Sequence, residues 1–160
     1  TPTTTRTTRM LTEGEAAPDF SLLDQHGETL SLSSLKGRKA LVYFYPKADT
    51  PGCTAQSCGL RDIADQVGDT AIIGISPDQP EDQLAFDQKY SLGFPLLADP
   101  THATADAYDV WGEVELPNGM KFTGIQRSAF LIDTDGTVER AWYKVSPADT
   151  PQNLLQALQS

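Results

Sequence analysis

The sequence predicts one α/β domain built on a mixed β-sheet flanked by helices. Between residues 40 and 108, apolar runs of strand length alternate with stretches in which apolar residues recur at helical spacing. This alternation is typical of parallel strands joined by helices. Residues 128–133 and 137–143 are two further apolar runs around an Asp-Thr-Asp-Gly turn, a signal for an antiparallel hairpin. The chain of 160 residues is long enough to bury one core of this kind.

The N-terminal part predicts a tail followed by a hairpin. Residues 1–10 are polar and repetitive, so we expect a loose tail there and a single domain over residues 11–160. Residues 17–23 and 29–32 flank a short polar segment rich in turn residues, and they predict an N-terminal hairpin. The next five residues end in glycine and predict one helical turn.

A continuous apolar run at residues 40–45 predicts a central strand that is covered on both faces. Pro80 and the two acidic residues after it mark a helix start, because proline fits the first turn and carboxylates favour the positive end of the helix dipole. The elements expected after this strand are a helix over 52–67, a strand over 70–75, a helix from Pro80 through Tyr90, a strand over 94–97, a short helix over 101–108, a hairpin of 113–116 with 121–125, strands over 128–133 and 137–143, and a helix that Thr150 caps and that runs through Leu158.

The two cysteines of the chain, Cys53 and Cys58, follow the predicted central strand. Cys53 comes directly after Pro51-Gly52, where a helix would begin. A thiol at a helix N-terminus faces unpaired backbone N–H groups and the positive end of the helix dipole, and both favour the thiolate. The position therefore predicts a reactive sulfur at Cys53.

The spacing of the cysteines has a geometric consequence. If both lay in one regular helix, their Cα atoms would be roughly 8–9 Å apart. A disulfide requires a Cα separation below about 7 Å. A bond between Cys53 and Cys58 would therefore require this helix to unwind locally.

Composition narrows the function classes. Apolar residues make up 39% of the chain and charged residues 21%, so the core needs no disulfide to stabilise it. The net charge of −10 disfavours nucleic acid as a partner, because phosphate binding needs a basic face. No apolar run approaches the roughly 20 residues that span a bilayer, and the first ten residues lack the apolar core of a signal peptide. We expect a cytoplasmic protein, and in that compartment a cysteine pair is more often catalytic or metal-binding than structural.

The segment around Cys53 resembles the peroxiredoxins. Pro46-x-x-x-Thr50-x-x-Cys53 matches their signature, and residues 45–54 resemble the PrxQ or bacterioferritin-comigratory branch. Residues 74–78, 94–99 and 124–133 resemble the same branch in the same order, so the similarity runs from about Leu11 to the C-terminal helix.

This resemblance implies a thioredoxin-like fold and the reduction of hydrogen peroxide and organic hydroperoxides to water and alcohols, in antioxidant defence, without a metal or organic cofactor. It implies Cys53 as the peroxidatic nucleophile, Cys58 as the resolving cysteine in an intramolecular disulfide, and Arg127 as the activating guanidinium. Thr50 and Pro46 would complete the pocket. The implied reductant is thioredoxin or a glutaredoxin-like protein, and nothing in the sequence demands more than a monomer. One residue, Ala129, stands where the pattern predicts threonine.

The implied chemistry is consistent with the residue types. A thiolate that attacks one peroxide oxygen drives negative charge onto the other, so fixed donors beside the leaving oxygen lower the barrier. Arg127 supplies several N–H donors and a permanent charge, and the Thr50 hydroxyl can accept and donate. Pro46 and Pro51 lack an N–H and would shield the oxidised sulfur.

Other interpretations of the same residues remain open. The cysteines could be inert thiols or half of a metal site, although two ligands without nearby histidines make a poor zinc site and His26 and His102 are isolated in sequence. Arg127 could form an ordinary surface ion pair. We assign no role to the two histidines, which we expect to be solvated. The large aromatic residues predict core or rim packing; they are Trp111, Trp142, Phe86 and Tyr90.

Two other function classes fit a reactive cysteine. A thiol–disulfide oxidoreductase of thioredoxin-like fold would carry Cys-x-x-Cys, whereas four residues separate the cysteines here. A peroxide sensor would use Cys53 without turnover. Sustained peroxide consumption with a thiol reductant distinguishes an enzyme from a sensor, which consumes one equivalent.

Overall fold

The computed structural model describes residues 14–35, 37–45, 51–63, 66–67, 70–108, 110–115, 119–143 and 149–159. The predicted N-terminal tail, residues 1–10, lies outside the described residues. The helices and strands, in chain order, are β1 (Ser21–Leu23), β2 (Thr29–Ser31), the 3-10 helix η1 (Leu32–Leu35), β3 (Ala40–Phe44), α1 (Pro51–Asp62), β4 (Ala71–Ser76), α2 (Pro80–Tyr90), β5 (Leu96–Ala98), α3 (Ala103–Ala107), β6 (Trp111–Glu115), β7 (Lys121–Ile125), β8 (Ser128–Ile132), β9 (Val138–Trp142) and α4 (Asp149–Gln159).

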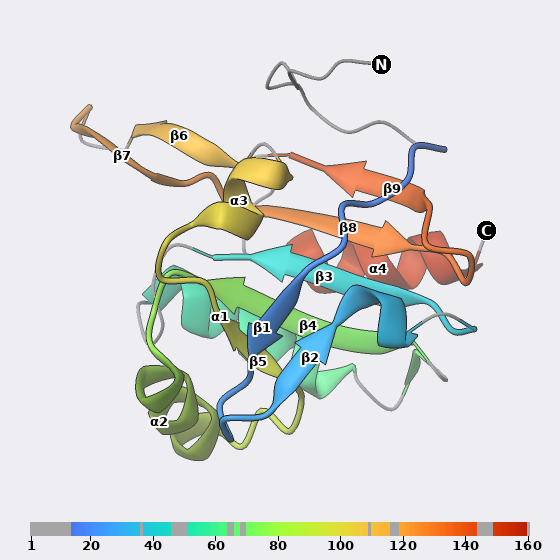
Figure 1. The fold of residues 1–160 in the computed structure, drawn as a ribbon, viewed down its shortest axis with the longest axis horizontal. Helices are drawn as coiled ribbons and strands as arrows, with labels where there is room; N and C mark the ends of the chain where they lie inside the picture. Colours follow the sequence, from blue (N-terminus) through green and yellow to red (C-terminus); the bar gives the residue numbers. More distant parts are fainter. Residues whose placement is uncertain are drawn as a thin grey trace.

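Seven of the strands form one mixed sheet in the order β2-β1-β5-β4-β3-β8-β9 (Figure 1). Strand β3 runs parallel to β4 on one side and antiparallel to β8 on the other. Strands β6 and β7 pair with each other in a separate hairpin, which projects from the body of the molecule (Figure 1). The predicted mixed sheet, the three predicted hairpins and the order of elements are confirmed.

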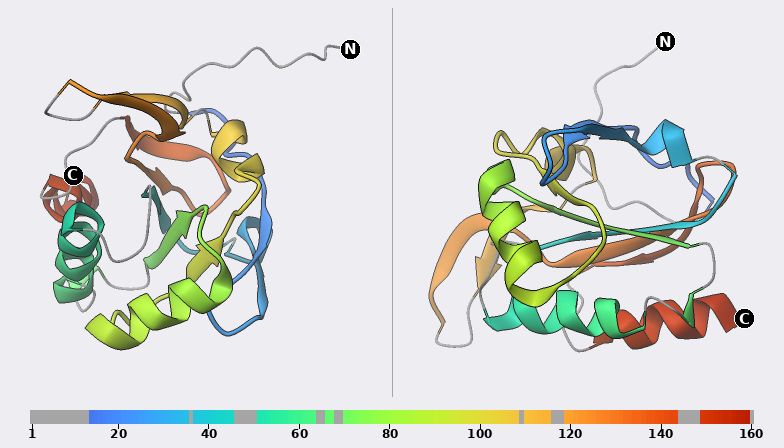
Figure 2. Two further views of the ribbon diagram at one scale, coloured as in Figure 1. Left: turned by 90° about the vertical axis from the view of Figure 1, so that its left-hand side faces the viewer. Right: turned by 90° about the horizontal axis from the view of Figure 1, so that it is seen from below.

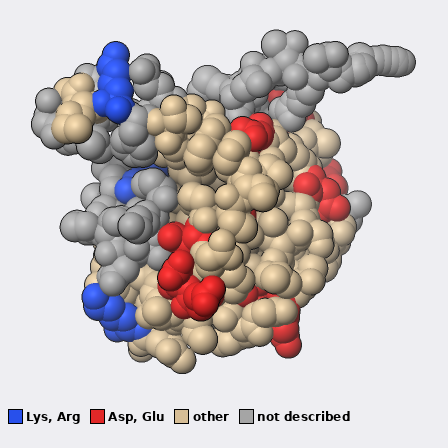
Figure 3. Space-filling model, turned by 60° about the vertical axis from the view of Figure 1, so that its left-hand side comes forward, with Lys and Arg blue, Asp and Glu red and all other residues tan. Residues whose placement is uncertain are grey.

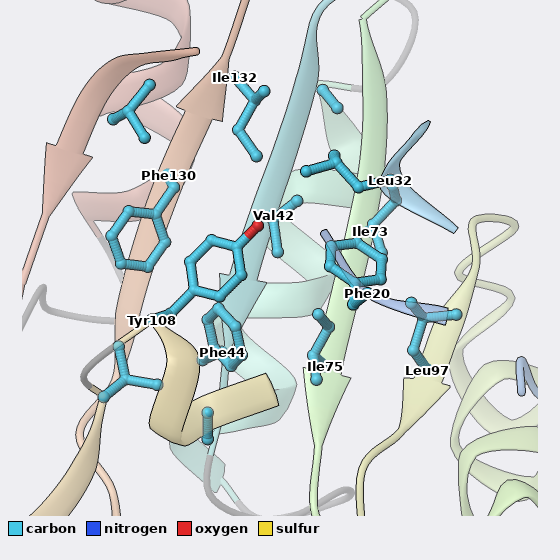
Figure 4. Close-up of a cluster of buried hydrophobic side chains, with 14 of the residues drawn as sticks. Phe20, Leu32, Val42, Phe44, Ile73, Ile75, Leu97, Tyr108, Phe130 and Ile132 are labelled. Atoms are coloured by element: carbon cyan, nitrogen blue, oxygen red, sulfur yellow. The ribbon is translucent and has the colours of Figure 1, made fainter. Parts of the chain in front are cut away.

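Strand β3 is buried on both faces because its side chains alternate between two hydrophobic clusters. Val42 and Phe44 belong to the cluster of Figure 4, which α3 and the N-terminal segment cover. Leu41 and Tyr43 belong to the other cluster, which α1, α2 and α4 cover. Helices α1 and α4 lie side by side on that face of the sheet (Figure 2).

The first long helix is shorter than the sequence predicts. It ends at Asp62 instead of residue 67, although Val67 is buried as the apolar spacing requires. Backbone bonds from Ile63 to Leu60 and from Gln66 to Ile63 connect residues three apart, so the chain continues in tight turns. A turn of three residues buries nearly the same positions as an α-helix, which explains why periodicity alone misplaced the end.

Candidate functional site

The sheet register brings Arg127 to the carboxyl end of the central strand. Phe44, the last residue of β3, pairs with Ser128, the first residue of β8. Because these strands are antiparallel, Arg127 lies just beyond the same sheet edge at which β3 ends. Helix α1 begins at that edge after the short segment that follows β3, so Arg127 and α1 meet although they are far apart in sequence.

Both cysteines lie in α1, as predicted. The helix begins at Pro51, which places Cys53 in its first turn, where backbone N–H groups have no partner within the helix. Cys58 is a half-buried free thiol further along the same helix. Regular helix geometry therefore keeps the two Cα atoms roughly 8–9 Å apart, too far for a disulfide without unwinding.

A buried glutamine links α1 to Arg127. The Nη1 of Arg127 donates to the Oε1 of Gln56 at 2.9 Å, across 71 residues of sequence. Gln56 is fully buried and follows Cys53 by three positions, so the two residues lie on neighbouring positions of one helix face. This bond holds the guanidinium against the first turns of the helix that carries Cys53.

The same amide reaches the C-terminal helix. Its Nε2 donates to the Oγ1 of Thr150 at 2.9 Å. The sequence predicted that Thr150 caps a helix beginning at Pro151, but α4 already begins at Asp149 and the Thr150 hydroxyl receives the bond from Gln56. Sequence reasoning missed Gln56 altogether, and its only signal was its place one turn after Cys53.

A second buried contact fastens the middle of α1 to the sheet. The hydroxyls of Tyr43 and Ser57 share a hydrogen bond of 2.7 Å, and both residues are fully buried. Near the end of the helix, Arg61 donates to the carbonyl of Tyr90 at 2.6 Å and to the carboxylate of Asp62 at 2.9 Å. The hydrogen bond with Asp62 raises the pKa of Arg61. The part of α1 that contains Cys58 is therefore tied to β3 and to the end of α2.

The end of β3 is fixed by a buried polar network. The hydroxyl of Tyr45 donates to the Oε1 of Gln83, and the Nε2 of Gln83 donates to the Oγ of Ser76 at 2.9 Å and to the carbonyl of Leu97 at 2.8 Å. Burial raises the pKa of Tyr45 well above its usual value, so this phenol stays neutral and remains a donor. The segment that carries Pro46 and Thr50 begins directly after this anchored tyrosine.

Several predicted positions are not placed by these contacts. Pro46 and Thr50 lie outside the described residues, and for Cys53 the structure describes the backbone alone. Ala129, where the resemblance predicted threonine, is fully buried in the cluster that contains Leu41 and Tyr43. A small apolar side chain suits that position because it faces the core.

The two histidines differ from each other. His26 is exposed, as predicted. His102 is not simply solvated: it is half-buried, its ring stacks on Trp111 with centroids 3.8 Å apart, and its Nδ1 lies 2.9 Å from the Oδ2 of Asp106. The prediction for His102 was wrong because a stacking partner nine residues away cannot be recognised from the sequence.

The predicted packing of the other aromatic residues agrees with the structure. Phe86 is buried, and Tyr90 and Trp142 are half-buried against the same hydrophobic cluster.

Charged side chains are unevenly distributed over the surface. Acidic side chains form several groups on the face in Figure 3, whereas Lys and Arg lie toward one edge of it. Among the described residues, no three His, Cys, Asp or Glu side chains are grouped so as to hold a metal ion. Within the same residues, no helix is both long and apolar enough to cross a membrane.

The chain is similar to known proteins over nearly its whole length. Residues 14–141 match the AhpC/TSA family. Peroxiredoxin Bcp of Bacillus subtilis is 44% identical over 147 residues, which are 91% of this chain and 93% of that protein. Peroxiredoxin Bcp of Escherichia coli is 46% identical over 134 residues, which are 82% of this chain and 85% of that protein.

A solved structure shows the same fold. It is the bacterioferritin comigratory protein of Xanthomonas campestris, whose structures concern its alkyl peroxide reduction activity. It is 30% identical, aligns with a TM-score of 0.83, and the match covers 92% of this chain and 98% of that one. The thioredoxin-like fold expected from the sequence is thereby confirmed.

Proposed function

Because this chain belongs to the AhpC/TSA family and, within it, to the peroxiredoxins of the Bcp type, we propose that Cys53 and Cys58 carry out its peroxidase reaction from a single helix. Membership of this family makes the chain a thiol-dependent peroxidase. The roles of the individual residues are our proposal.

In the first step, the Cys53 thiolate attacks one oxygen of a hydroperoxide and the O–O bond breaks. The sulfur becomes a sulfenic acid, and the other oxygen leaves as hydroxide or alkoxide and takes up a proton. Cys53 is oxidised by two electrons and the peroxide is reduced to water or an alcohol. The N-terminus of α1 favours the thiolate form that this step needs.

Arg127 stabilises the charge that develops on the leaving oxygen. A guanidinium carries a permanent charge and several donors, and donors fixed before the reaction lower the barrier most. The observation that carries this proposal is the bond from Arg127 to Gln56, which keeps the guanidinium on the helix of Cys53. Thr50 and Pro46 complete the pocket.

In the second step, the sulfur of Cys58 attacks the sulfenic sulfur of Cys53. An S–S bond forms, the S–O bond breaks, and the oxygen leaves as water. Both cysteines lie in α1, so this step requires the first turns of the helix to unwind. A dithiol reductant then restores both thiols, and we assign this role to thioredoxin or a glutaredoxin-like protein.

Both reacting cysteines come from one helix of one chain, so the cycle needs no second subunit and we propose a monomer with a single domain over residues 11–160. A cycle that returns to two free thiols is suited to a reducing compartment, and we propose the cytoplasm.

The test is a steady-state peroxidase assay with hydrogen peroxide, thioredoxin and thioredoxin reductase. Cys53→Ser should abolish turnover, and Cys58→Ser should remove turnover with thioredoxin while leaving one equivalent of peroxide consumed. Arg127→Ala should slow the reaction of the reduced protein with peroxide, because the transition state loses about 2–4 kcal/mol of stabilisation. Undiminished turnover by Cys53→Ser, or a single equivalent consumed by the wild type, would refute the enzymatic proposal.

A further inference from the structure

Thr150 fixes the orientation of the amide that holds Arg127. A guanidinium only donates hydrogen bonds, so the group of Gln56 that faces Arg127 must be the carbonyl oxygen. The NH₂ group of Gln56 is then directed to Thr150, where the Oγ1 accepts its bond at 2.9 Å. The direction of both bonds follows from the chemistry of the three side chains.

Because the Gln56 and Thr150 side chains are buried, the loss of their hydrogen bond is unfavourable. Gln56 is 0% exposed and Thr150 is 1% exposed, so solvent does not replace either partner without a rearrangement. If the hydroxyl were removed, the amide would keep a buried NH₂ without this acceptor or would rotate and turn its NH₂ toward Arg127. A buried donor without a partner is unfavourable, and an NH₂ group offers the guanidinium no acceptor.

The packing of α4 against α1 determines where the Thr150 hydroxyl lies. Thr150 lies in the first turn of α4, which runs beside α1 (Figure 2). Leu154 and Ala157, further along α4, are buried in the hydrophobic cluster that also contains Leu60 of α1. The position of Thr150 relative to Gln56 is therefore set by the packing of two helices.

We propose that Thr150 is a positioning residue for the reaction with peroxide, acting through Gln56 on Arg127. This proposal rests on the function proposed above, in which Arg127 stabilises the leaving oxygen. It adds a residue 94 positions from Gln56 in sequence, and a helix that carries neither cysteine, to the parts of the molecule that set the rate of the first step.

The test measures the second-order rate constant of the reduced protein with hydrogen peroxide by rapid mixing. Thr150→Val removes the acceptor at nearly constant volume, and Thr150→Ala removes it with a smaller side chain. Both should lower the rate constant about fivefold, the factor that corresponds to one hydrogen bond of ordinary strength. Thr150→Ser keeps the hydroxyl and should restore most of the wild-type rate constant.

Two comparisons separate positioning from general destabilisation. Val138→Ala removes buried atoms from the other hydrophobic cluster, away from α1 and α4, and the folded protein should retain the wild-type rate constant. In a Gln56→Met background the link to Arg127 is already absent, so adding Thr150→Val should change the rate constant no further. Additive effects of these two substitutions, or a folded Thr150→Val protein that reacts as fast as wild type, would overturn the proposal. A wild-type protein that does not react with peroxide would overturn both this proposal and the proposed function.

Discussion

Tyr43 and Ser57 share a hydrogen bond of 2.7 Å that joins the central strand to the middle of α1. Ser57 lies between Cys53 and Cys58, and its neighbour Gln56 is bonded to Arg127 and Thr150. Helix α1 is thus fastened at Gln56 and Ser57, the two residues that directly precede Cys58. Unwinding should therefore begin in the turns before Gln56, and Cys53 should travel toward Cys58.

Tyr43→Phe should loosen this fastening, so that unwinding extends from the first turns through Ser57 and the disulfide forms faster. Loss of one buried hydrogen bond costs about 1 kcal/mol, which corresponds to a several-fold larger unwound population. Stopped-flow tryptophan fluorescence would follow peroxide reaction and disulfide formation as separate phases. The control is Tyr45→Phe, because the hydroxyl of Tyr45 bonds to Gln83 of α2 and not to α1. Equal disulfide rates in wild type and Tyr43→Phe would show that this bond does not restrain the helix.

Gly74→Ala should destabilise the fold by displacing the same tyrosine. A Cβ at Gly74 would lie 2.8 Å from the Tyr43 hydroxyl and 3.0 Å from the Cδ2 of Leu96. Overpacking of a core costs about 1–3 kcal/mol. Urea unfolding measures this loss, with Gly112→Ala as the matched control, because its nearest atom is 3.6 Å away in ordinary contact. Equal unfolding free energies for the two variants would contradict the close packing at Gly74.

The free energy of unfolding should fall as pH rises above about 10. Burial, followed by the charges of Asp19 and Tyr143, raises the pKa of Tyr108 above its usual value. In the unfolded chain tyrosine ionises at about pH 10, whereas the folded residue stays protonated. The unfolded state then binds fewer protons, so the contribution of Tyr108 is fully present below pH 10 and is lost at higher pH.

Tyr108→Phe isolates that contribution. Above about pH 10, the unfolding free energy of this variant should decline less steeply with pH than that of the wild type. The two slopes should differ by about 1.4 kcal/mol per pH unit, because the variant lacks one ionising proton. Urea unfolding under reducing conditions, between about pH 9 and pH 11.5, measures the slope of the unfolding free energy against pH. Identical slopes in the two proteins would mean that Tyr108 ionises in the folded state as readily as in the unfolded one.

Much of the fold can be predicted from the sequence because its elements have local signals. The apolar run at residues 40–45 identified the buried central strand, and Pro80 with two acids marked the start of α2. The end of α1 could not be located in this way, because tight turns bury Val67 as a helix would. Local signals locate burial better than they locate helix ends.

In the candidate site, too, local signals predict some features and not others. The Pro51-Gly52 break placed Cys53 in the first turn of a helix, as the structure has it. The link from Gln56 to Thr150 spans 94 residues and depends on the packing of two helices, and no local pattern encodes it. The stack of His102 on Trp111 escaped prediction for the same reason.

Oxidation should raise amide hydrogen exchange in the first turns of α1. Both cysteines lie in this helix, so forming the disulfide breaks helical hydrogen bonds around Cys53. Exchange across residues 52–62, compared between reduced and oxidised protein by mass spectrometry, should increase most before Gln56. Residues 152–157 of α4 serve as the internal control and should change little. A disulfide that forms with protection of α1 unchanged would contradict the unwinding step.

Mapping the cysteines after one equivalent of hydrogen peroxide tests the proposed chemistry most directly. Peptides from the unreduced protein should contain Cys53 and Cys58 joined within one chain, with two hydrogens lost and no free thiol. In Cys58→Ser, a sulfenic-acid reagent should label Cys53. The result that would contradict the account is a reduced Cys53 beside an oxidised Cys58, or a Cys53 oxidised to sulfinic acid while Cys58 of the wild-type protein remains a free thiol.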